Sequence, residues 1–354
     1  MDHSPIFIHS LHRCGSTWLF QVFRRAAANY WCYAEPAHQV VASLLPTGQL
    51  LSIGQSLATT LRHGELERPY YWELVQVQAQ IIGLVNEAIS YKNYFAPHRL
   101  CEQDRQYFAA LIAAAPYRPV LQFCRSAGRA HALKEAFGGL HVHLWREPRS
   151  QWWSMKVDQY FDDAIQLIYN SPNLPPALAW VRKRVRLCRV KLNSVQSDVE
   201  KVRSEALSRE EAYLAFYALW LYANVHLRRI ADIEFSIDRA SLDVDYRARV
   251  ASDLSDAGVG GICMDDCRIP MVSLQPAEIG WYAAIEQKVH DNMLRSESAR
   301  DLDVVSHELQ LIRSLELPEH NLADELRRQR ELTLRMIEAF QYTYRNYFHL
   351  RNAS

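Results

Sequence analysis

A short loop near the amino terminus carries the residue types that bind an anion. An apolar segment, Ile6–His9, precedes the loop, and a helical pattern over residues 17–28 follows it. The loop supplies a cation, a glycine and two hydroxyl groups: Arg13, Cys14, Gly15, Ser16 and Thr17. Glycine lets the backbone approach a ligand closely, and a helix start presents unpaired N–H groups at its positive end. The pattern predicts a phosphate-binding strand–loop–helix unit.

The loop differs from the common ATP-binding loop. The pattern GxxxxGK[ST] is absent, and no lysine follows Gly15. The loop is therefore predicted to hold a phosphate without the usual lysine and magnesium ion, and no metal is expected.

A second segment offers another arginine at a strand end. Leu140–Trp145 is another short strand-like segment, and Arg146-Glu-Pro-Arg follows it directly. Pro148 suits the first turn of a helix, where its missing N–H is no loss. In nucleotide hydrolases a strand of this kind ends in an aspartate that holds magnesium. Arginine in that place predicts direct pairing with a second phosphate, with Ser154 two helical turns beyond it.

The two segments together resemble the cofactor-binding motifs of sulfotransferases that use 3′-phosphoadenosine 5′-phosphosulfate (PAPS). Residues 13–19, RCGSTWL, are similar to the 5′-phosphosulfate loop, typically (K/R)-S-G-(S/T)-(T/S), with Cys14 in place of the usual serine. Residues 146–154, REPRSQWWS, are similar to the 3′-phosphate motif, R-(D/N/E)-P-R with a later serine. Residues 33–36, YAEP, resemble the Glu-Pro of carbohydrate sulfotransferases. The resemblance covers roughly residues 5–40 and 116–160.

The resemblance implies a role for each matching position. The residues that it assigns to the donor are Arg13, Cys14, Gly15, Ser16, Thr17, Trp18, Arg146 and Ser154. Negative charge grows on the bridging oxygen as the bond to the 5′-phosphate breaks, and a fixed cation there is favoured most in the transition state. Arg13 is implied for this catalytic role.

Sulfuryl transfer to a hydroxyl also needs a base. Glu35 directly follows the apolar segment Tyr30–Ala34, and ligands in open α/β sheets gather at the carboxyl ends of strands. Its position twenty-two residues after Arg13 is similar to that of the glutamate base in carbohydrate and tyrosylprotein sulfotransferases. The alternative for Glu35 is a capping or salt-bridged glutamate, and His38 is a reserve base.

Arg125 ends a further strand-like segment, residues 120–124. Two roles are open for an arginine at this edge of the sheet: binding the oxygens of the transferring sulfuryl group, or forming a structural ion pair.

The order of the segments predicts an α/β fold. Strand-like runs alternate with helical patterns, which favours a parallel sheet covered on both faces. The expected strands are Ile6–His9, Tyr30–Ala34, 120–124, Leu140–Trp145 and 233–237. The expected helices are 17–28, 71–90, 129–137, 151–160, two long helices between 176 and 231, 245–257 and an amphipathic helix after Asn321. The resemblance implies one P-loop NTPase-like three-layer domain over residues 1–354, with helical insertions around 46–116 and 161–230.

Composition narrows the classes of partner. The chain has 354 residues, 49% of them hydrophobic, and its 40 basic residues balance its 40 acidic residues. No global charge therefore recruits nucleic acid, and no run of eighteen apolar residues predicts a membrane span. Seven cysteines, an odd number, favour reduced thiols and a cytoplasmic location.

The sequence thus predicts an enzyme that moves a sulfuryl group from PAPS to a hydroxyl. The Glu-Pro resemblance implies a carbohydrate or glycolipid acceptor. Two alternatives stay open: a P-loop phosphotransferase that uses ATP, and a non-catalytic nucleotide-binding protein. The identity of the acceptor and the oligomeric state are not predicted.

Overall fold

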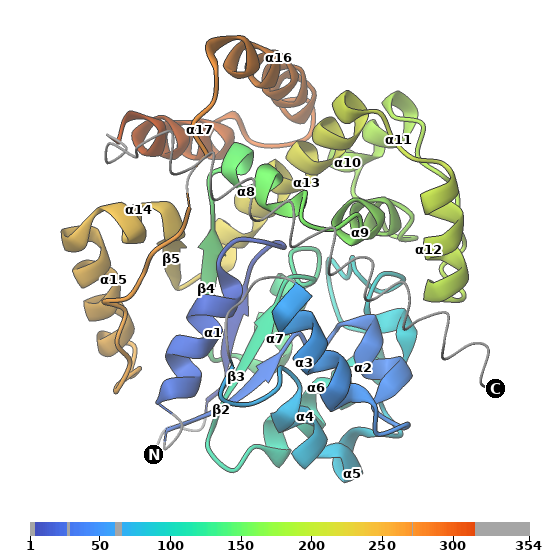
Figure 1. Cartoon of the computed structure of the whole chain (residues 1–354), viewed down its shortest axis with the longest axis vertical. Coiled ribbons are helices and arrows are strands. Elements are labelled where there is room, and N and C mark those ends of the chain that lie inside the picture. The colour runs from blue at the N-terminus through green and yellow to red at the C-terminus, as the bar shows by residue number, and fades with distance from the viewer. Residues whose placement is uncertain (1–3, 27–28, 61–65, 271, 316–354) are drawn as a thin grey trace.

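A five-stranded parallel sheet forms the centre of the molecule (Figure 1). The computed structural model describes residues 4–26, 29–60, 66–270 and 272–315, so the helix expected after Asn321 lies outside the described residues. The strands are β1 Ile6–His9, β2 Tyr30–Ala34, β3 Arg118–Phe123, β4 Leu140–Trp145 and β5 Ile233–Ser236. Their order in the sheet is β2-β3-β1-β4-β5.

Burial explains why these segments form parallel strands. Every residue of β1, β3 and β4 is buried, polar ones such as His141 and Gln122 included, as expected for a sheet covered on both faces. The predicted α/β fold with a parallel central sheet is confirmed. The third strand begins two residues before the predicted segment 120–124 and ends one residue before its end.

The strand order places β1 beside both β3 and β4. From β1 the chain continues to β2, at one edge of the sheet. It then returns through β3, next to β1, and crosses to β4 on the other side of β1. In open α/β sheets, ligands bind at the carboxyl ends of strands where the order reverses in this way. Helix α1, Ser16–Arg25, follows β1 and packs on β2 and β3, whereas α13, Arg209–Ile230, packs on β4.

Further helices surround the sheet. In Figure 1, α2 to α6 gather beside β2, α14 and α15 flank β5, and α16 and α17 lie near α8. Their bounds are α2 Gln39–Leu44, α3 Leu50–Thr60, α6 Glu102–Ala114, α7 Ala130–Phe137, α8 Pro148–Met155, α9 Tyr160–Tyr169, α14 Ile237–Leu242, α15 Val244–Asp256, α16 Pro276–Met293 and α17 Ala299–Ser314.

The expected single helix over residues 71–90 is wrong. The segment forms α4 Trp72–Gln76, α5 Gln78–Ile81 and the 3₁₀ turn Glu87–Ile89. Asn86 is extended, and its side chain accepts a hydrogen bond from the N–H of Ala88 at 2.8 Å, so it caps a new turn. The cap starts a new turn at a point where hydrophobic periodicity alone predicts one continuous helix.

The two long helices expected between 176 and 231 are also partly wrong. Only α13 is long, and its predicted capping box at Ser208 and Glu211 is present. The rest consists of α10 Pro176–Ala179, α11 Val181–Arg184 and α12 Val195–Ser204. Val185 has extended backbone angles and ends α11 after one turn. The expected helix 151–160 is likewise divided between α8 and α9.

Candidate functional site

The β1–α1 loop is held in an uncommon backbone conformation. Gly15 caps α1 with φ of 80°, and Arg13 has φ of 67°. A Cβ atom on Gly15 would lie 2.9 Å from Cγ1 of Ile237, so glycine is required by conformation and by space. No side chain caps α1, and its first turn holds no acidic residue. The positive end of the helix therefore faces the loop without a side-chain counter-charge.

Direct hydrogen bonds join this loop to the β4–α8 segment. Nε of Arg13 donates to Oγ of Ser154 at 3.0 Å. Nη1 of Arg146 donates to the backbone oxygen of Arg13 at 3.2 Å. The structure thus brings together three residues that the sequence predicts for donor binding, although more than 100 positions separate the two segments.

A buried carboxylate accompanies Arg146. Asp238, in α14 directly after β5, has Oδ1 3.9 Å from Nε of Arg146, and its Oδ2 accepts the N–H of Glu147 at 2.6 Å. Arg146 also donates to the backbone oxygen of Pro270. Burial raises the pKa of Asp238 to about 6, against the opposing charge of Arg146. The guanidinium of Arg146 is therefore bonded mainly to neutral oxygens, and its Nε has no hydrogen-bond partner among the described residues.

Four charged side chains brace the segment that follows Arg146. Arg149 donates to Glu286 of α16 at 2.9 and 2.8 Å. Arg313 of α17 donates to Oε1 of Glu147 at 2.9 Å and to Oε1 of Glu286 at 3.0 Å. Glu147 in turn caps α8 by accepting the N–H of Ser150 at 2.8 Å. The two C-terminal helices thus fix the start of α8.

Two sulfur atoms lie in or beside the loop. Burial raises the pKa of the Cys14 thiol to about 12, so this position is a neutral thiol. The hydroxyl of Ser16 lies 3.4 Å from Sγ of Cys124, which follows β3. Ser16 thus connects the loop to the neighbouring strand end.

The side chains of Thr17 and Trp18, which follow Ser16, form hydrogen bonds to distant parts of the chain. Thr17 accepts a hydrogen bond from the hydroxyl of Tyr70 at 3.2 Å. The indole N–H of Trp18 donates to Asp266 at 3.0 Å. Trp18, predicted for donor binding, therefore anchors the segment that precedes α16.

Glu35 and Arg125 form an ion pair at the ends of β2 and β3. Nη1 of Arg125 lies 2.8 Å from Oε2 of Glu35, and Nε2 of Gln122 donates to Oε1 at 3.0 Å. Glu35 has φ of 42°, a strained value for a residue with a side chain. The structural ion pair foreseen for Arg125 is present, and its partner is the candidate base.

His38 is held as a neutral ring. Burial lowers the pKa of His38, and the charge of Arg125 lowers it further. Its Nδ1 accepts the N–H of Val40 at 3.1 Å, which puts the ring proton on Nε2. Nε2 then donates to the hydroxyl oxygen of Tyr160 at 3.0 Å. The reserve base thus fixes Tyr160 and leaves the hydroxyl hydrogen of Tyr160 available for another acceptor.

The start of α9 connects the two groups of candidate residues. Arg125 lies over the ring of Tyr160 at 5.8 Å, and Arg13 lies over the ring of Phe161 at 5.7 Å. His12 contacts both rings, and its buried Nε2 has no hydrogen-bond partner among the described residues. The aromatic pair at the start of α9 thus contacts one arginine from each group of candidate residues.

Sequence reasoning missed several of these residues. Asp238 follows the predicted fifth strand, so applying the strand-end rule there would have found it. Gln122, Tyr160, Glu286 and Arg313 gave no signal, because their partners lie far away in sequence. Among the described residues, no group of three or more His, Cys, Asp or Glu side chains forms a candidate metal site.

Comparisons with protein-family models, curated proteins and solved structures give no match to this chain. In the part of the chain that the structure describes, no helix combines the length and apolar character that crossing a membrane requires. All seven cysteines lie in that part as well, and none of them forms a disulfide.

Proposed function

We propose that this chain is a PAPS-dependent sulfotransferase with a P-loop NTPase-like, three-layer single domain. Its acceptor is proposed to be a hydroxyl of a carbohydrate or glycolipid. One observation carries the proposal: the loop of Arg13 and the strand end of Arg146 meet at the carboxyl edge of the sheet through a direct hydrogen bond. PAPS has two phosphate groups on one nucleoside, and two adjacent cationic strand ends suit such a ligand.

The residues present fit the donor. The start of α1, which has no side-chain cap and follows the left-handed turn at Gly15, suits the 5′-phosphosulfate. Arg146, whose hydrogen bonds go to backbone oxygens, suits the 3′-phosphate, because a charged oxygen is a better partner for guanidinium than a neutral carbonyl. Arg13, fixed by Ser154, would neutralise the charge that develops on the leaving phosphate.

Glu35 is the proposed base. In the transfer, the acceptor oxygen bonds to sulfur, the bond from sulfur to the 5′-phosphate breaks, and the acceptor proton passes to the carboxylate of Glu35. Arg125 donates to one carboxylate oxygen and Gln122 to the other, which holds the group in a single orientation. Pre-organisation of this kind supports proton transfer without reorientation.

An ATP-dependent phosphotransferase is the second candidate. Asp238 favours it, because a carboxylate at a strand end is a common magnesium ligand in that class. Its pairing with Arg146 disfavours the same role, since the guanidinium already supplies a positive charge 3.9 Å from Oδ1 of Asp238.

Calorimetry with the wild-type protein separates the candidates. The titrants are adenosine 3′,5′-bisphosphate (PAP, the expected product) and ATP, each with and without magnesium. A sulfotransferase binds PAP more tightly and without metal, whereas magnesium-dependent binding of ATP with weak binding of PAP would contradict the proposal.

A variant then tests the base. Glu35→Gln should lower PAP release from PAPS in the presence of acceptor by at least about 100-fold, because general base catalysis contributes that much. PAP binding should stay within about twofold of wild type, because no donor phosphate is assigned to Glu35. Glu87→Gln, a partly buried glutamate that bonds to Ser43 and Val195, is the matched control. Unchanged turnover in Glu35→Gln would remove Glu35 from the mechanism.

A further inference from the structure

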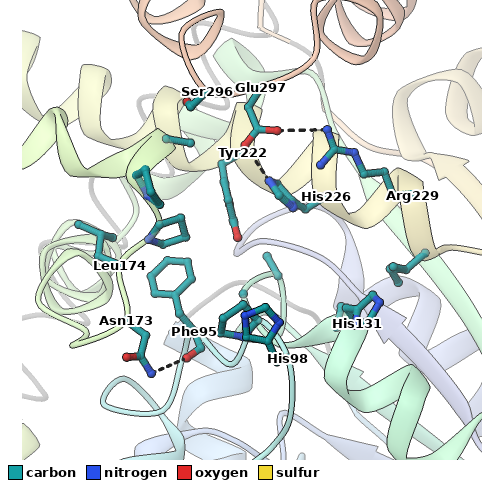
Figure 2. Close-up of a pocket in the computed structure, with 18 residues that line it drawn as sticks. Phe95, His98, His131, Asn173, Leu174, Tyr222, His226, Arg229, Ser296 and Glu297 are labelled. Atoms are coloured by element: carbon teal, nitrogen blue, oxygen red, sulfur yellow. Dashed lines mark hydrogen bonds and ion pairs between the residues drawn. The ribbon is translucent and has the colours of Figure 1, made fainter.

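A cavity of about 630 Å³ lies outside the site described above (Figure 2). Its walls come from the start of α7, the second half of α13 and three loops around Phe95, Leu174 and Glu297. Small-molecule sites typically have volumes of about 300–1,000 Å³. The cavity is therefore large enough for a ligand of several fused or linked rings.

One side of the cavity is made of flat apolar groups. The rings of Phe95 and Tyr222 meet edge to face at a centroid distance of 5.9 Å, and both residues are buried. Leu174, Pro175 and Pro176 continue this wall. Such a surface offers van der Waals contact to the faces of a ring.

On the other side of the cavity, the side chains of Glu297, His226 and Arg229 are already paired with one another. Oε1 of Glu297 lies 2.9 Å from Nε2 of His226, and Oε2 lies 3.1 Å from Nη2 of Arg229 (Figure 2). Arg229 is also bonded to Asp301 at 2.6 Å. A ligand charge placed beside Glu297 would lose its hydration without gaining an unpaired counter-charge. Two further histidines of the lining, His98 and His131, are exposed to solvent on the opposite side (Figure 2).

The hydroxyl of Tyr222 on the cavity wall is not hydrogen-bonded to the described part of the protein. Tyr222 is 6% exposed, and its hydroxyl has no hydrogen-bond partner among the described residues. Figure 2 shows this hydroxyl pointing into the cavity, away from the Glu297 cluster. Burial raises the pKa of Tyr222, so the phenol is a neutral donor and acceptor. The hydroxyl oxygen itself is open to the cavity, so a ligand there can exchange a hydrogen bond with it.

We infer that this cavity is a binding site for an uncharged, ring-bearing molecule that exchanges a hydrogen bond with Tyr222. The ring lies against Leu174 and the prolines, which are the more exposed part of this wall, and the polar group of the ligand faces the Tyr222 hydroxyl. The inference does not depend on the proposed sulfotransferase activity, because none of the residues assigned to donor or base lines the cavity.

Two probes with the same ring system test the charge requirement. Calorimetry compares 2-naphthol, which is uncharged at neutral pH, with 2-naphthoate, which is an anion. The inference predicts binding of 2-naphthol and at least tenfold weaker binding of 2-naphthoate. Equal or tighter binding of the anion, or no binding of 2-naphthol, would overturn it.

Three variants locate the binding. Tyr222→Phe removes only the hydroxyl and should weaken 2-naphthol binding about fivefold, the worth of one net hydrogen bond. Tyr217→Phe, on the same helix but outside the cavity lining, should leave the affinity unchanged. Asn173→Trp, at an exposed position of the cavity rim, should block binding. Binding that all three variants leave intact lies elsewhere and contradicts the inference.

Discussion

Arg125 and Glu35 form an ion pair across two strand ends, with Nη1 2.8 Å from Oε2. The arginine side chain is fully buried, and the glutamate side chain is 15% exposed. The pair joins the residue after β2 to the second residue after β3, and these strands are neighbours in the sheet. It therefore fixes the candidate base to the frame of the sheet, at a residue whose φ is positive.

Removal of Arg125 should destabilise the fold strongly. Arg125→Met leaves a largely buried carboxylate without its counter-charge, which typically costs about 3–5 kcal/mol of unfolding free energy. Chemical denaturation monitored by circular dichroism measures this loss. The double variant Arg125→Met with Glu35→Gln should recover part of it, because the orphaned charge is gone. A single variant that loses less than about 1 kcal/mol would show that the pair is not buried as described.

Alanine at Gly15 should cost more than alanine at Gly48. Both glycines have positive φ, 80° and 72°, so each substitution carries the strain of a left-handed conformation, about 1–2 kcal/mol. Only at Gly15 does the new Cβ also meet a side chain, that of Ile237. We expect Gly15→Ala to lose additional stability and PAP affinity, whereas Gly48→Ala keeps wild-type affinity. Equal losses of stability and equal affinities in the two variants would contradict the close approach of α14 to the loop.

Asp238 should make stability depend on pH. Burial raises its pKa to about 6 from an ordinary 3.8, so the folded chain binds this proton more tightly than the unfolded chain. Its contribution is fully present below about pH 4 and is lost as pH rises through about 6, by on the order of 3 kcal/mol. The unfolding free energy of wild type minus that of Asp238→Asn should fall over this window. A difference that is constant with pH would refute the assignment.

Arg313 should act on nucleotide binding from a distance. Its bonds to Glu147 and Glu286 hold the residues that follow Arg146. We expect Arg313→Met to lower PAP affinity about fivefold, the worth of about 1 kcal/mol, and to affect AMP less, since AMP lacks the 3′-phosphate. Arg300→Met, at an exposed position of the same helix, is the control. Parallel losses for PAP and AMP would indicate general destabilisation instead of a positioning role.

The sheet was predictable because its strands are short, mostly apolar segments. Ile6–His9 and Leu140–Trp145 have the predicted bounds, and in the structure even their histidines are buried. The helical regions were less predictable. Local caps such as Asn86 interrupt segments that hydrophobic periodicity predicts as continuous.

The candidate site was predictable where a residue follows a strand directly. Arg13, Glu35, Arg125 and Arg146 all stand within a few residues of a strand end, and the structure places them at the carboxyl edge of the sheet. Residues that other elements bring to this edge could not be predicted, because no sequence pattern indicates their place. Tyr160 lies at the start of α9, and Glu286 and Arg313 approach from the C-terminal helices, so only the folded chain brings them to the site.

The central claim is tested most directly by the ratio of PAP affinity to AMP affinity, measured in the wild type and in an Arg146 variant. Arg146→Met keeps much of the buried volume, and circular dichroism verifies that it folds. We predict that the wild type binds PAP about 10- to 100-fold more tightly than AMP, the worth of charge-assisted hydrogen bonds to one phosphate, and that the variant binds both alike. A variant that keeps the wild-type ratio would show that Arg146 does not bind a 3′-phosphate and would contradict the proposed function.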